Sequence, residues 1–230
     1  MGIAVDAASI FFGSIFGSMF KKKACITDFS VLAISIMLIS LVGFLENIFN
    51  ISDMQLTSDA LMVVIFSLIA GSMIGEFIHI EDNLSKLSNG ENVSHNAFVD
   101  AMLFFGVGGL QISGPIMLGV NGDSGQLLIK SLVDFPFALV FGATYGKITS
   151  LSAIPVAIVQ IIIAVVSRIF GSIFNESLIA QLCSMGYIIL FFSGFNLISE
   201  KNKINNVNML PGILIVFIYN SIVGVIGGLK

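Results

Sequence analysis

The sequence predicts an all-α protein that crosses a membrane several times, as a single integral membrane domain over residues 1–230. Hydrophobic residues make up 56% of the chain and charged residues 10%, and the mean hydropathy is +1.02. The apolar stretches are about 20 residues long, which is the length of a helix that crosses the hydrocarbon core of a bilayer. Residues 154–166 are almost continuously apolar, without the alternation of a transmembrane β-strand. A helical bundle is therefore the expected fold.

About eight apolar stretches follow one another, separated by short polar segments. They lie at roughly 3–20, 31–49, 60–80, 97–118, 127–147, 151–172, 178–198 and 208–229. Their orientation is predicted by the cations, which favour cytoplasmic loops. With the amino terminus outside, seven of the ten cations fall in cytoplasmic loops: Lys21, Lys22, Lys23, Lys86, Lys147, Lys201 and Lys203. We therefore expect both termini to be extracytoplasmic.

The first, third and fifth apolar stretches share a pattern of small residues near their ends. Each has two glycines four residues apart: Gly13 and Gly17, Gly71 and Gly75, Gly142 and Gly146. The three stretches run in the same direction in this topology, so the pattern indicates a parallel internal repeat. Small residues at this spacing let helix backbones approach closely. We expect these glycines to pack helices together or to form the contact surface of a homo-oligomer.

The fourth stretch is the least regular. Residues 106–115 contain four glycines, one proline, and the polar residues Gln111 and Ser113. Glycine and proline weaken a helix, and backbone groups freed in hydrocarbon need neighbours, water or a ligand as partners. The pattern predicts a broken helix of the kind that transporters place beside a substrate. A kinked, glycine-packed helix without a ligand is the alternative.

Lys130 and Asp134 form a charged pair within the fifth stretch. Their spacing of four places both side chains on one face of a helix, where they can form an ion pair. Charges are costly inside a bilayer, so this face is expected to line the bundle interior or a wet cavity. Alternatively, Lys130 reaches the outer interface and Asp134 only neutralises it. Pro136 follows and is expected to kink the helix close to the pair.

Three further polar residues lie inside apolar stretches: Gln160, Asn196 and Asn220. Taken singly, each can join two helices by a hydrogen bond; taken together, they can line a polar path. The candidate residues of a substrate or ion pathway are therefore Lys130, Asp134, Gln111, Ser113, Gln160, Asn196 and Asn220.

Other classes of function find little support in the sequence. The chain has two cysteines and two isolated histidines, which do not give the ligand spacing of a metal site. It lacks the motifs of intramembrane enzymes, so we expect no enzyme activity. Nothing predicts a cofactor, and the absence of a basic cluster argues against nucleic acid as a partner. The expected partners are the lipid bilayer, a small ion or polar solute, and a second copy of the chain.

Several short segments, in the same order and spacing over the whole chain, carry a family resemblance: residues 1–2, 70–76, 128–134, 153–155 with Gln160, 194–197 and 207–211. On these the chain resembles the DUF554 family of bacterial multi-spanning membrane proteins. The resemblance implies a location in the bacterial plasma membrane and a role in transport, without an established substrate or catalytic residues. The family has glycine after its Lys-Ser-x-x-Asp core, where this chain has Phe135.

Two functions remain open at this point. The first is a transporter or channel for a small ion or polar solute, in which Asp134 beside Lys130 couples solute movement to proton movement. The second is a membrane packing or assembly protein without transport, in which the glycines and polar groups hold helices together. A transporter should have a hydrated cavity that reaches Asp134, whereas a packing protein should have Asp134 sealed against Lys130.

Overall fold

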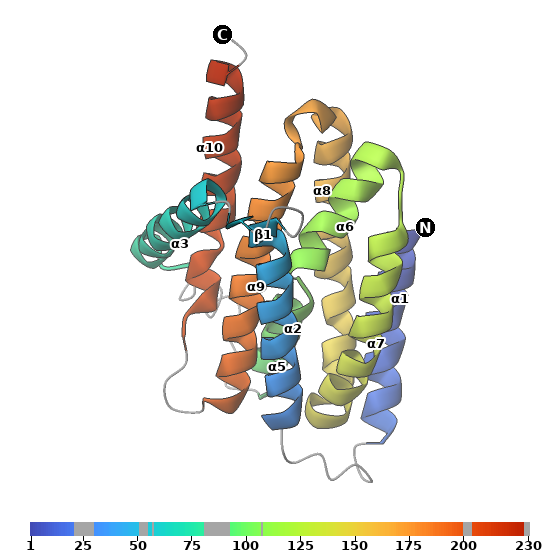
Figure 1. Ribbon diagram of the computed structural model, residues 1–230. Helices are drawn as coiled ribbons and strands as arrows, with labels where there is room; N and C mark the ends of the chain where they lie inside the picture. Colours follow the sequence, from blue (N-terminus) through green and yellow to red (C-terminus); the bar gives the residue numbers. More distant parts are fainter. Residues whose placement is uncertain are drawn as a thin grey trace. The chain divides into compact units, whose positions relative to one another are not determined.

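A computed structural model gives the protein as a set of helices (Figure 1) and describes residues 1–20, 30–50, 55–56, 58–80, 93–106, 108–199 and 204–227. The α-helices are α1 (Gly2–Met19), α2 (Ser30–Ile48), α3 (Ser58–Phe77), α5 (Val93–Gly106), α6 (Gly109–Asn121), α7 (Gly125–Tyr145), α8 (Ala153–Ile169), α9 (Glu176–Ile198) and α10 (Pro211–Gly227). The 3-10 helices are η1 (Lys147–Ser152), η2 (Gly171–Ile173) and η3 (Asn206–Met209). A short antiparallel ladder pairs β1 (Phe49–Asn50) with β2 (Gln55–Leu56).

Helices occupy the predicted apolar stretches in the described part of the chain, which confirms the all-α membrane fold. Five helical segments are long and apolar enough to span a membrane: Gly2–Met19, Gly125–Tyr145, Lys147–Ile169, Glu176–Asn196 and Asn206–Val223. Shorter apolar helices cover Ala33–Ile48 and Leu61–Phe77. Of the cations expected in cytoplasmic loops, Lys147 is described, whereas the other six lie outside the described residues.

Large apolar side chains are exposed along these helices. Leu132 on α7 is 76% exposed and Phe66 on α3 is 70% exposed. In water such apolar surface would be unfavourable and prone to association. In a bilayer the same side chains contact lipid tails, so the exposure fits a multi-pass membrane protein.

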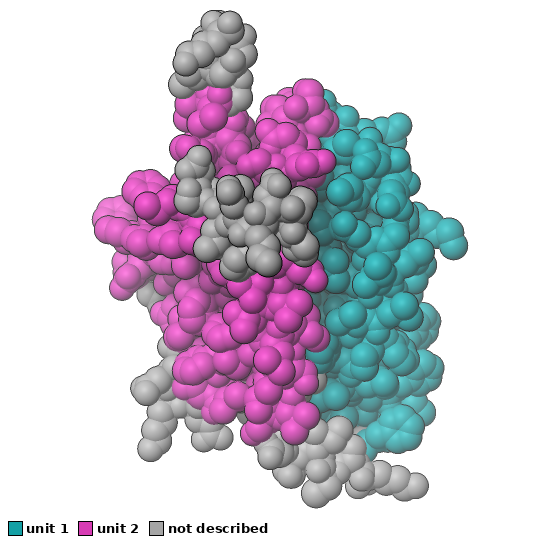
Figure 2. Space-filling view, viewed as in Figure 1, with its two compact units in different colours: residues 1–29, 86–169 teal, residues 30–85, 170–230 magenta. Residues whose placement is uncertain are grey.

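The contacts divide the chain into two compact units, coloured separately in Figure 2. Unit 1 contains residues 1–29 and 86–169, and unit 2 contains residues 30–85 and 170–230. Each unit therefore combines two separate segments of the chain. The single integral membrane domain expected over residues 1–230 stays a prediction.

In unit 1, α1 and α7 lie side by side and run in the same direction. Gly2 lies against Leu127 near the start of α7, and Gly17 lies against Leu139 further along. A Cβ atom added at Gly17 would collide with the backbone of Leu139. The two backbones can approach this closely because α1 carries no side chain at that point.

The fourth predicted stretch is two helices rather than one kinked helix. α5 ends at Gly106 and α6 begins at Gly109. Between them Gly108 has a φ of 154°, which residues with a side chain rarely adopt. α6 then packs along α8, where Gly119 lies against Ala164. The glycine-rich sequence thus breaks the stretch within unit 1, as the sequence predicts.

Unit 2 contains two packed helix pairs. α2 packs on α9, with Gly43 facing the ring of Tyr187. α3 packs on α10, with Gly71 facing Gly212, and on η3, with Gly75 facing Asn208. In both pairs a glycine on one helix makes room for the partner helix.

Candidate functional site

Three ionisable side chains are buried together inside unit 1. Lys130 and Asp134 lie one turn apart on α7, and the Lys130 ammonium donates to an Asp134 carboxylate oxygen. Lys130 Nζ also lies 3.0 Å from Asp6 Oδ2 on α1. The exposed fractions are 4% for Lys130, 7% for Asp134 and 0% for Asp6. One cation is therefore held between two carboxyl groups, and solvent reaches none of them freely.

Two glutamines extend this cluster to two further helices. Gln160 Nε2, on α8, donates to Asp6 Oδ2 at 2.6 Å and to Gln111 Oε1 at 2.8 Å. Gln111, in the first turn of α6, approaches the backbone oxygen of Val156 with its Nε2 at 3.4 Å. Both glutamines are 1% exposed or less. We call Asp6, Gln111, Lys130, Asp134 and Gln160 the polar cluster; it links four helices of unit 1.

The local sequence explains why these side chains point inward. The buried face of α1 is formed by Gly2, Asp6, Ile10, Ser14 and two glycines, at spacings of three and four residues that keep one face of the helix together. The same spacing places Lys130 and Asp134 on the buried face of α7. Asp6 is therefore buried because it lies on the face by which α1 packs on α7.

Irregular backbone lies next to the polar cluster. Gln111 follows the break between α5 and α6, and Pro115 on the same helix has no N–H to donate to the Gln111 carbonyl. On α7, Pro136 lies two residues after Asp134 inside the helix. Breaks of this kind in membrane helices occur where protein or a water-filled cavity satisfies the backbone.

Two buried acceptor atoms of the cluster have no hydrogen-bond partner: Asp6 Oδ1 and Gln160 Oε1. A buried acceptor without a donor costs about 1–3 kcal/mol. If both carboxyl groups are ionised, the cluster also carries two negative charges against one positive charge. Two acceptors therefore lack a donor, and with both carboxyl groups ionised the cluster also lacks one positive charge.

The other pathway candidates lie elsewhere. Ser113 is buried on α6, two residues beyond Gln111. Asn196 belongs to unit 2, where its side chain binds the backbone N–H and carbonyl of Ile204. Asn220, also in unit 2, donates to Gln181 Oε1 at 2.7 Å. The structure thus brings together Lys130, Asp134, Gln111 and Gln160, and places both asparagines in hydrogen bonds within the other unit.

The paired glycines lie in two kinds of structural environment. Five of them face the backbone of a neighbouring helix or segment within their own unit: Gly13, Gly17, Gly71, Gly75 and Gly142. Gly146 differs, because it follows α7 as its C-cap with a φ of 87°. A left-handed backbone at a helix end favours glycine for its conformation rather than for packing.

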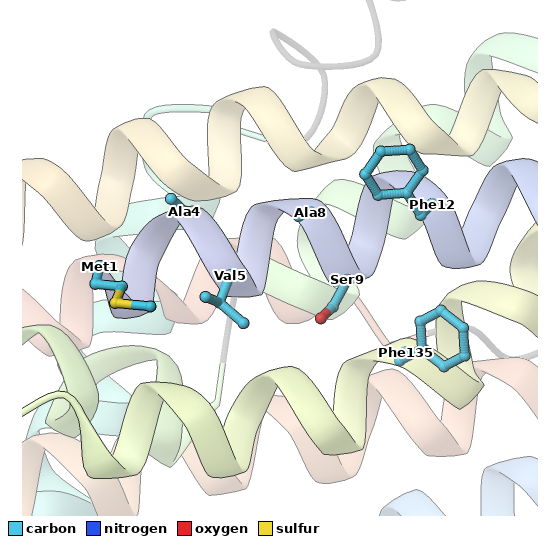
Figure 3. Close-up of a pocket in the computed structure, with 7 residues that line it drawn as sticks. All are labelled: Met1, Ala4, Val5, Ala8, Ser9, Phe12 and Phe135. Carbon is cyan, nitrogen blue, oxygen red and sulfur yellow. The ribbon is translucent and has the colours of Figure 1, made fainter.

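A shallow apolar groove of about 400 Å³ runs along the outer face of α1. Figure 3 shows its lining, which comes from α1 and from Phe135 of α7: Met1, Ala4, Val5, Ala8, Ser9, Phe12 and Phe135. Phe135 stands here at the position where the resemblance implies glycine. The groove contains no member of the polar cluster.

Sequence reasoning missed Asp6, although a signal was present. Asp6 is the one ionisable side chain in residues 2–19. A carboxyl group inside an apolar helix is itself an indication of function. Its position near the amino terminus makes it resemble an interfacial residue, and the lysine that pairs with it lies 124 positions later.

Apolar helices with exposed hydrophobic faces and a buried polar cluster define a multi-pass integral membrane protein. Within that class the chain belongs to the DUF554 family, because the family model described as "Protein of unknown function (DUF554)" matches residues 1–221. The resemblance found in the sequence is thereby confirmed.

Two relatives share most of its length. The chain is 29% identical over 219 residues to the uncharacterized membrane protein YdfK of Bacillus subtilis (strain 168), with 93% of each chain covered. It is 25% identical over 168 residues to the uncharacterized protein YqgA of Escherichia coli (strain K12), with 67% of this chain and 71% of the relative covered. No solved structure matches the chain significantly.

Proposed function

We propose that this protein is a transporter or channel for a small ion or polar solute, and that the polar cluster of unit 1 is its binding site. The carrying observation is the buried set of one lysine and two carboxyl groups with unpartnered acceptor atoms. Ionisable residues inside membrane helices are costly and commonly mark ion or substrate pathways.

The backbone around the cluster supports the same proposal. Gln111 follows directly on the break at Gly108, and transporters place binding sites at such interruptions, where helix ends and freed carbonyls face the solute. The cluster also joins four helices that come from two chain segments. A shift of one helix would therefore change the hydrogen bonds of the whole cluster.

The competing function is a membrane packing or assembly protein, and one observation favours it. Asp134 is 7% exposed and paired with Lys130, which is the sealed arrangement expected of a packing protein. Under the transport proposal this is the occluded conformation, and the pair opens to one side of the membrane during the transport cycle.

The proposal extends to location and partners. We place the protein in the bacterial plasma membrane with both termini extracytoplasmic, in contact with lipid along its exposed apolar faces. It acts without a cofactor and is not an enzyme. The solute remains open between an ion and a small polar molecule.

A ligand screen on the purified protein tests the proposal. Ions and small polar metabolites are added to wild type and to Asp134→Asn, and the melting temperature is measured. A ligand that binds the folded state raises this temperature. We expect at least one ligand to stabilise wild type but not Asp134→Asn, and the same ligand to cross the membrane of liposomes that contain wild type.

The matched control is Asp123→Asn, which removes one carboxylate from an exposed position of unit 1. It should respond to the ligand as wild type does. If no ligand shifts wild type, while Asp134→Asn alone lowers the melting temperature, the pair is structural. The packing function then replaces transport.

A further inference from the structure

The two unpartnered atoms of the polar cluster belong to groups that are already joined. Asp6 Oδ2 accepts from Gln160 Nε2 at 2.6 Å, whereas Asp6 Oδ1 and Gln160 Oε1 lack partners. A carboxylic acid and a primary amide bind each other most completely through two hydrogen bonds that close a ring. The N–H···O half of this ring is present, and the two unpartnered oxygens are the atoms that the other half would join if one of them carried a hydrogen.

A proton is the one addition that satisfies both atoms without a further heavy atom. Added to Asp6 Oδ1, it forms an O–H bond there and donates to Gln160 Oε1. The other Nε2 hydrogen of Gln160 remains bonded to Gln111 Oε1. No other hydrogen bond of the cluster has to change.

The charge of the cluster points the same way. With Asp6 neutral, Lys130 and Asp134 form an ion pair without net charge. With Asp6 ionised, one uncompensated negative charge stays at a residue that is 0% exposed, and an unpaired buried charge is strongly unfavourable. The proton therefore supplies the donor that the two oxygens lack and cancels the excess negative charge.

Asp6 and Asp134 differ in burial and in their neighbours. The side chain of Asp134 is 10% exposed and sits one turn from Lys130 on the same helix, whereas the side chain of Asp6 is 0% exposed. Gln160 Oε1, the acceptor that an acid needs, belongs to the amide that is bonded to Asp6.

We infer that Asp6 is the proton-binding residue of this protein, held as a neutral acid in a ring with Gln160, and that the ion coupled to transport is a proton. The second half of the inference rests on the proposed function; the first concerns the folded protein alone. Loss of the proton leaves Asp6 free to compete with Asp134 for Lys130. Proton release is thereby linked to the ion pair that seals the cluster.

The charged groups on the elements around Asp6 are few within the described residues. α7 contributes Lys130 and Asp134. η1 contributes Lys147, α8 contributes Arg168, and the chain begins with the Met1 amino group; all three are exposed at the ends of their elements. Lys130 is thus the cation in direct contact with Asp6.

Infrared spectroscopy of the intact protein in lipid nanodiscs tests the inference. A protonated aspartic acid has a carbonyl stretching band that an aspartate lacks, and labelling of aspartate with carbon-13 separates it from glutamic acid. Near neutral pH we expect such a band in wild type and in Asp123→Asn, and its loss in Asp6→Asn. In Asp134→Asn the band should also disappear, because Lys130 then has Asp6 as its one carboxylate partner and Asp6 ionises. In Gln160→Leu the band should move to higher frequency, because the amide hydrogen bond is gone.

Three results would overturn the inference. A band that does not move in Gln160→Leu places the proton on Asp134, because the hydrogen bonds of Gln160 within the described residues go to Asp6 and Gln111. The absence of any band in wild type means that Asp6 is ionised and that a water joins the two oxygens. A band that appears only when sodium and potassium are replaced by choline identifies an alkali cation as the occupant.

The outcome separates this inference from the proposed function. If solute flux is measured without the band, the transport proposal is retained and the protonation of Asp6 is rejected. If the band is assigned to Asp6 but no solute crosses the membrane, the protonated Asp6–Gln160 pair is retained and the transport proposal is rejected.

Discussion

Lys130 is the residue on which the polar cluster depends. Its ammonium contacts Asp6 on α1 and Asp134 on α7, so it holds a tertiary contact as well as a local one. Replacing one member of a buried ion pair leaves the other charge without compensation, which costs more than the net value of the pair.

Lys130→Met should therefore lower the free energy of unfolding by about 3–5 kcal/mol. The triple variant Asp6→Asn, Lys130→Met, Asp134→Asn should recover most of this loss, because it leaves no buried charge. Equilibrium unfolding in mixed micelles measures both. Equal stability of Lys130→Met and wild type would show that the contacts seen here contribute nothing to folding.

The cluster was partly predictable from the sequence. Lys130 and Asp134 could be paired because their spacing along one helix is local information. The link from Gln160 to Asp6 could not, because it joins residues 154 positions apart. Asn196 and Asn220 look the same as Gln160 in a sequence, and only tertiary packing distinguishes the residues that meet Asp6 from those that bind within unit 2.

At the scale of helices, close packing depends on glycines at contacts with neighbouring backbone. A Cβ atom at Gly142 would meet backbone atoms of Ser14 on α1, whereas one at Gly106 would meet only Val156 Cγ2, at 3.9 Å. The spacing of the glycines predicts which helices can pack closely. It does not reveal the partner, since α1 pairs with α7 whereas α3 pairs with α10.

Gly142→Ala should lower the free energy of unfolding by about 1–3 kcal/mol, because α1 must move away from α7 to make room for the methyl group. Gly106→Ala is the matched control, since the added methyl fits and alanine favours a helix. It should be neutral or slightly stabilising. Thermal unfolding of both variants measures the difference, and equal melting temperatures would mean that α1 and α7 are not in close contact.

At the scale of the whole molecule, the chain passes between the two units after residues 29, 85 and 169. The helices themselves could be predicted because each depends on local composition. The division into units could not, because it depends on contacts such as that of α1 with α7, whose residues are more than 100 positions apart. Orientation in the membrane remains a prediction from the distribution of cations.

Cysteine labelling tests that orientation through α7. With Cys25 and Cys183 replaced by serine, a single cysteine is placed at Asp123 or at Lys147, exposed positions that flank α7 at its two ends. A helix of 21 residues is about 30 Å long, enough to cross the hydrocarbon core. On intact cells a membrane-impermeant thiol reagent should label Asp123→Cys and not Lys147→Cys, and permeabilised cells should show labelling of both.

Labelling of Lys147→Cys alone in intact cells would show that the topology is the reverse of the predicted one, with both termini inside. Labelling of both variants in intact cells would mean that α7 does not span the membrane. The polar cluster would then lie outside the bilayer, and its burial would no longer be a reason to expect transport.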